Sequence, residues 1–139
     1  MQASRKIRVR KIISCEYVRP EINNKHTIIG ASPSGDIQVA EFPATFGIAF
    51  YIEALCNETG NQSIKISVLY NKQRLGILSV QMDVANINVP AIIAFPTIPV
   101  AARGPGVLEL YVENGRSYRI FKESVRLAEQ PLSAATPPI

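Results

Sequence analysis

Apolar and polar side chains alternate with a period of two along most of this 139-residue chain. The clearest example lies between residues 44 and 56, where Phe46, Ile48 and Phe50 share one parity. Successive side chains of a β-strand point to opposite faces of the sheet, so this period is typical of strands. No window of about eleven residues keeps the helical period without a glycine or a proline. The pattern therefore predicts an all-β fold.

Turn signals separate the alternating segments at regular spacing. Asn114-Gly115 is the strongest of them, because both central residues of a tight hairpin turn need positive φ. We count about eight strands, which predicts an antiparallel β-sandwich that is immunoglobulin-like in the loose sense. The segment 44–56 also has apolar residues at the other parity, so we expect it to be central and covered on both sides.

The length and the composition fit one domain. An apolar fraction of 47% and a charged fraction of 19% are typical of a globular protein. We predict a single domain over residues 1–128 and a Pro- and Ala-rich tail over residues 129–139. No signal peptide is expected, because polar residues between positions 14 and 21 interrupt the apolar segment that should follow the N-terminal charges. No transmembrane helix is expected either, because the most apolar stretch, 89–100, is short and contains three prolines. The expected location is the cytoplasm.

Positive charge is concentrated near the N-terminus. The formal net charge is +4, and five basic residues lie between positions 5 and 11, while the rest of the chain is nearly balanced. Lys6, Arg8 and Arg10 would share one face of a strand, which suits an acidic protein surface or a line of phosphates. The alternative is a charged strand edge that only prevents edge-to-edge pairing. We name these three as candidate interaction residues and expect no contact with a membrane.

A second candidate surface is the apolar run at residues 91–95. Ile92, Ile93 and Phe95 exceed what a loop between strands needs, and an edge strand interrupted by prolines can accept a partner strand. The alternative is that these side chains fill the core from the edge of a sheet. We add these three to the candidate interaction residues.

No catalytic or metal-binding pattern stands out. A single histidine, His26, and two distant cysteines do not make a structural zinc site. His26 precedes a loop with two serines and Asp36, but no nucleophile-elbow pattern accompanies them. Cys15 and Cys56 are expected to be buried thiols, with one disulfide between them as the alternative. We therefore predict a protein that is not an enzyme and has no catalytic residues, cofactor or metal.

Three short segments carry a resemblance to a known family. They are residues 15–18 (CEYV), residues 28–30 (IIG) after Lys25, and Phe42-Pro43 before a long apolar strand. Together they resemble a small family of uncharacterised bacterial proteins, whose members are short, all-β, immunoglobulin-like and without an assigned function. The likeness covers residues 12–127, and it implies the fold but no site residues.

The leading hypothesis for function is a non-catalytic protein-interaction or scaffolding module, whose partner is another protein or a second copy of the chain. One rival is a structural component of an assembly, such as a phage particle or a surface layer, which predicts oligomerisation that depends on concentration. The other is association with nucleic acid through the basic N-terminal arm, which predicts binding that weakens steeply with salt.

Overall fold

The computed structural model describes residues 7–32, 36–114 and 116–128. These residues form ten strands and one short 3₁₀ segment, and they include no α-helix. The predicted tail at 129–139 and the candidate residue Lys6 lie outside the described residues. The strands are β1 (Ile7–Cys15), β2 (Tyr17–Pro20), β3 (His26–Ile29), β4 (Asp36–Val39), β5 (Ala44–Cys56), β6 (Gly60–Tyr70), β7 (Gln73–Val84), β8 (Ala91–Ala102), β9 (Gly106–Asn114) and β10 (Arg116–Leu127), and the 3₁₀ segment is Ile22–Asn24.

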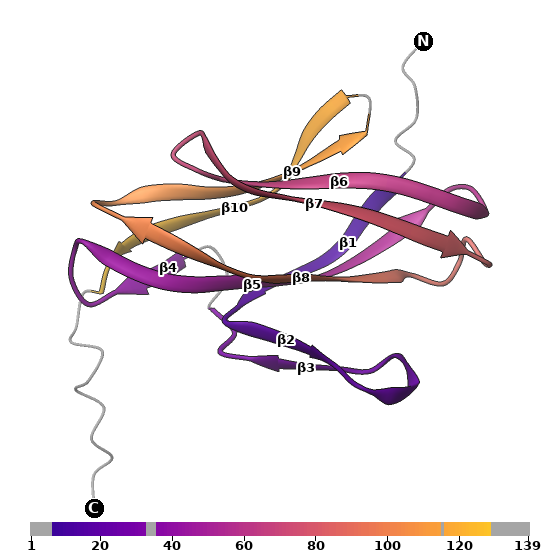
Figure 1. Cartoon of the computed structure of the whole chain (residues 1–139), viewed down its shortest axis with the longest axis horizontal. Coiled ribbons are helices and arrows are strands. Elements are labelled where there is room, and N and C mark those ends of the chain that lie inside the picture. The colour runs from indigo at the N-terminus through magenta and orange to yellow at the C-terminus, as the bar shows by residue number, and fades with distance from the viewer. Residues whose placement is uncertain (1–6, 33–35, 115, 129–139) are drawn as a thin grey trace, which may run out of the picture.

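The strands form two larger sheets and a separate hairpin. One sheet has three strands in the order β1-β5-β8, the other has five in the order β4-β10-β9-β6-β7, and β2 pairs with β3 (Figure 1). The all-β prediction is confirmed. The predicted number of strands was too low, because a break at Glu16 separates β2 from β1 and residues 36–39 form a strand of their own. One pair also departs from the antiparallel prediction, since β4 runs parallel to β10.

The main core lies between the inner faces of the two larger sheets. Phe50 on β5 is fully buried, and its ring meets the ring of Phe95 edge-on at 6.0 Å and that of Phe121 at 5.3 Å. Phe95 belongs to the same sheet and Phe121 to the opposite one. Edge-to-face contacts of this kind are favourable beyond the area they bury, so this cluster ties the two layers together.

The β2–β3 hairpin adds a third layer on the outer face of the three-stranded sheet (Figure 1). Val18 from β2 and Ile28 from β3 pack against Cys15 and Ala49. Ala49 and its neighbour Phe50 point to opposite faces of β5, and both are fully buried. The prediction that β5 is central and covered on both sides is therefore confirmed.

Register shifts interrupt the ladders of β1 and β10. The pairing of β1 with β5 shifts between Val9 and Lys11, and that of β10 with β9 shifts between Arg119 and Phe121. An extra residue in one strand of a pair shifts the alternation by one position, so apolar residues of different parity face the core before and after the extra residue.

Candidate functional site

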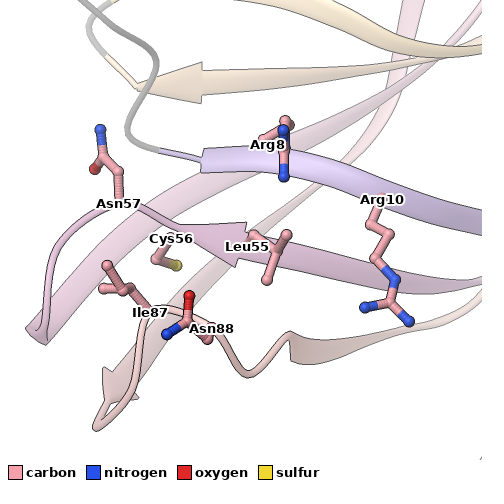
Figure 2. Close-up of a pocket in the computed structure, with 7 residues that line it drawn as sticks. All are labelled: Arg8, Arg10, Leu55, Cys56, Asn57, Ile87 and Asn88. Atoms are coloured by element: carbon pink, nitrogen blue, oxygen red, sulfur yellow. The ribbon is translucent and has the colours of Figure 1, made fainter.

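A pocket with a volume of about 410 Å³ opens where β1 begins and β5 ends. Figure 2 shows that its walls come from three places that are distant in the sequence. The first is β1, the second is the end of β5 with the residue after it, and the third is the connection between β7 and β8. The lining residues are Arg8, Arg10, Leu55, Cys56, Asn57, Ile87 and Asn88.

The two arginines reach this pocket because of where β1 lies in the sheet. Arg8 is directly opposite Leu55 in the antiparallel ladder of β1 and β5. Arg10 has no partner in this ladder, because it lies at the register shift between Val9 and Lys11, and its side chain reaches the pocket from there. Both side chains line the pocket, and both residues are exposed to solvent.

The lining is electropositive. It holds two guanidinium groups and two side-chain amides, and none of its residues is acidic. Outside the lining, Oε1 of Glu53 lies 3.4 Å from Nε of Arg10. A guanidinium group presents several N–H donors in a planar fork that matches a carboxylate or a phosphate. The pocket therefore has the chemistry to hold an anionic group against the apolar side chains of Leu55 and Ile87.

The thiol in the pocket is poorly suited to covalent chemistry. Cys56 is 4% exposed and forms no disulfide. Burial raises the pKa of the Cys56 thiol above its usual range. A thiol with a raised pKa stays protonated near neutral pH, and the protonated form is a weak nucleophile. Within this pocket, Cys56 contributes a wall and not a reactive group.

A second polar cluster adjoins the pocket through Glu53. The hydroxyl of Tyr51 donates a hydrogen bond of 2.9 Å to Oε2 of Glu53, and the rings of His26 and Tyr51 meet edge-on at 5.6 Å. Burial raises the pKa of the Tyr51 hydroxyl, and the hydrogen bond to Glu53 raises it further. Through Glu53, these contacts connect β3 and β5 with Arg10 of the pocket lining.

The residues considered for a Ser-His-Asp arrangement have other partners in the structure. His26 lies against Tyr51, whereas Asp36 accepts a hydrogen bond of 2.7 Å from Nε of Arg126. The hydrogen bond from Arg126 holds the pKa of the Asp36 carboxyl below its usual range. Among the described residues, no group of three or more His, Cys, Asp or Glu side chains is placed to hold a metal ion.

The structure divides the candidate interaction residues into three groups. Arg8 and Arg10 line the pocket, and Ile92 is half-buried beside Glu53 in the ladder of β5 and β8. Ile93 and Phe95 are 3% and 2% exposed and belong to the main core. The three apolar residues therefore do not form one surface, because successive residues of β8 point to opposite faces.

Sequence reasoning did not find the far wall of the pocket. Asn57 and Asn88 lie in connections between strands, and nothing in the local sequence indicates that these connections meet. The cationic side was visible because charge can be read directly from the sequence.

Within the described part of the chain, no helix is long and apolar enough to cross a membrane.

Comparisons with known proteins give no family assignment. No family model matches this sequence, and no curated protein matches it. The resemblance to uncharacterised bacterial proteins therefore stays a prediction.

Proposed function

We propose that the protein is a non-catalytic interaction module that holds an acidic side chain or a terminal carboxylate of a partner protein in the pocket at the start of β1. Arg8 and Arg10 would bind the carboxylate, and the amides of the lining would supply further hydrogen-bond donors. Leu55 and Ile87 would contact the apolar part of the same segment.

The observation that carries this proposal is the convergence of two guanidinium groups on a pocket whose lining has no carboxylate. The pocket also has an apolar wall and a limited volume, which suits a single side chain or chain end. Binding through a pocket of this kind needs no reactive group, and the raised pKa of the Cys56 thiol is consistent with that.

The test is binding of a fluorescein-labelled peptide of alternating glutamate and serine, followed by fluorescence anisotropy. Replacement of either Arg8 or Arg10 by alanine should weaken binding roughly tenfold, because a hydrogen-bonded charge contact is lost. Lys25→Ala is the matched control, since it removes an exposed positive charge outside the pocket lining. Equal losses in all three variants would mean that only net charge matters, and the proposal would then fail.

The same assay separates this proposal from nucleic-acid binding through the basic arm. A single-stranded oligonucleotide replaces the peptide, and the affinity is measured over a range of salt concentrations. Binding by a line of cations weakens steeply as salt rises, because each phosphate contact releases counterions. Tighter binding of the oligonucleotide than of the peptide, with a steep dependence on salt, would favour the nucleic-acid alternative.

We further propose that the fold is an immunoglobulin-like β-sandwich in the loose sense, present as a single domain and located in the cytoplasm. The two facing sheets and their shared core support the β-sandwich. The parallel pair β4–β10 departs from a purely antiparallel sandwich. A role as an assembly component would require self-association, in which edge strands of the two sheets would pair with strands of another copy.

A further inference from the structure

The two larger sheets have four edge strands, and three of them carry features that discourage pairing with another strand. β1 has Arg8, Arg10 and Lys11 together with a register shift between Val9 and Lys11. β8 contains two prolines and a shift in its ladder with β5, and β4 has only four residues. Charge, proline, irregularity and short length are the usual means by which proteins prevent edge-to-edge association.

The fourth edge strand, β7, lacks this protection over most of its length. β7 has 12 residues, contains no lysine and no proline, and pairs with β6 in a regular ladder from Gly76 to Val84. Its two charged residues, Arg74 and Asp83, lie near its opposite ends. Ile77, between them, is 45% exposed. A long, regular and largely uncharged edge offers unpaired main-chain groups to another strand.

We propose that β7 is a self-association edge, where two copies of the chain pair β7 with β7 in antiparallel orientation about a two-fold axis at Ser79. Two five-stranded sheets would then become one continuous sheet across the dimer. In this register Ser79 meets Ser79 of the second copy, and Ile77 lies opposite Gln81. Asp83 then falls beside the hairpin end of the other copy, which carries Arg74.

Charge complementarity selects a second copy of this chain as the occupant. The outer face of β7 carries Arg74 opposite Leu69 and Ile77 opposite Ser67, so both side chains lie on one face despite the register shift between them. Asp83 lies on the same face, opposite Asn61. In the proposed register Asp83 lies opposite Leu75 of the other copy, so each aspartate is one residue away from the arginine of the other copy. Within its own chain, Nη2 of Arg74 lies 2.9 Å from Oε1 of Glu113 on β9, so a contact with Asp83 of the other copy requires Arg74 to share or leave this ion pair.

The inner side of β7 gives a second reason for pairing. Leu78 and Val80 pack against the main core, yet both remain only partly buried. Their neighbours toward the end of the strand, Met82 and Val84, are 9% and 8% exposed. The core is therefore less well covered in the middle of β7, and an added strand would cover it there. Burial of this apolar surface would add to the main-chain hydrogen bonds of the new ladder.

The first test is the oligomeric state of the full chain, measured by sedimentation equilibrium up to roughly millimolar concentration. We expect a reversible dimer. Ser79→Lys should weaken it roughly fivefold or more, because the two lysines would face each other at the axis. Ser117→Lys is the control, since it adds the same charge at an exposed position of β10, away from the edge. A monomer at every concentration, or equal weakening by both variants, would overturn the proposal.

The second test fixes the register by cysteine cross-linking under mild oxidation. Ser79→Cys alone should give a disulfide-linked dimer, because this position meets itself across the axis. Ile77→Cys alone and Gln81→Cys alone should not, whereas a mixture of the two should. The native thiols of Cys15 and Cys56 are buried, so they add little background. Cross-linking of Ile77→Cys with itself, or none by Ser79→Cys in a dimeric sample, would show that a different surface or register is used.

Discussion

The charge of Glu109 should matter more for stability than that of any exposed carboxylate on the same sheet. Glu109 lies on the outer face of β9, yet it is 1% exposed, because the side chains around it cover it. Nζ of Lys72 lies 3.1 Å from its Oε1, and Nη1 of Arg119 lies 3.2 Å from its Oε2. Burial by itself would raise the pKa of Glu109, but the hydrogen bonds from Lys72 and Arg119 hold it below its ordinary value.

The size of the effect follows from the unequal exposure of the partners. Breaking a fully buried ion pair costs about 3–5 kcal/mol, whereas an exposed pair is worth at most about 1 kcal/mol. The carboxylate of Glu109 is buried, but the side chains of Lys72 and Arg119 are 74% and 47% exposed. We therefore expect Glu109→Gln, which keeps the shape and loses the charge, to lower the free energy of unfolding by about 1–3 kcal/mol at pH 7.

The assay is urea unfolding followed by circular dichroism at pH 7 and again near pH 3. A lowered pKa in the folded state means that the charge stabilises the fold above the ordinary glutamate pKa, and that this contribution is lost as the pH falls through the folded value. The difference between wild type and variant should therefore shrink at the lower pH. Glu113→Gln, at a side chain that is 28% exposed, is the control and should change stability by about 0.5 kcal/mol or less.

Two results would refute this reasoning. An equal loss for Glu109→Gln at both pH values would mean that packing and not charge is responsible. A loss no larger than that of Glu113→Gln would mean that burial of Glu109 does not strengthen its ion pairs.

Three further predictions concern the core, a turn and the thiols. Phe50→Leu should lower the free energy of unfolding by about 2–4 kcal/mol, because two edge-to-face contacts are lost together with buried volume. Phe46→Leu, at a half-buried site, should lower it by about 1 kcal/mol. Equal losses in the two variants would contradict the packing described. Gly30→Ala should lower the free energy of unfolding by about 1–2 kcal/mol in the same assay, since φ at Gly30 is +68° and the added Cβ would lie 2.7 Å from the side chain of Glu16. Gly104→Ala is the control and should leave the stability nearly unchanged, because the space around Gly104 is open. The two buried thiols, whose pKa burial raises, should react with a chromogenic disulfide much more slowly in the native protein than in urea, and similar rates would show that they are accessible.

The alternation of side chains was sufficient to predict the all-β fold and most of the strands, because one face of most strands lies in the core. It did not predict how the strands would be arranged. The parallel pair β4–β10 joins Asp36–Val39 to Ser124–Leu127, and a pairing between such distant segments has no local signal. The position of the β2–β3 hairpin was similarly hidden, since its packing on Ala49 depends on the fold of β5.

The candidate site was predictable only on its charged side. Arg8 and Arg10 stand out in the sequence, but the amides opposite them come from connections that only the fold brings together. The run from Ala91 to Phe95 is apolar at both parities, so alternation could not show which side chains face the core. Glu109 shows the opposite difficulty, because alternation places it on the outer face and long neighbouring side chains then bury it.

The parallel pairing of β4 with β10 also has a consequence for how the protein is made. β4 leaves the ribosome early, but the strand that it pairs with is the last one described, ending at Leu127. The five-stranded sheet therefore cannot be completed until β10 has been synthesised. Pairings between such distant segments slow folding, since a long loop must close first. Until β10 emerges, the strand β4 has no partner, and this edge of the five-stranded sheet stays incomplete in the nascent chain.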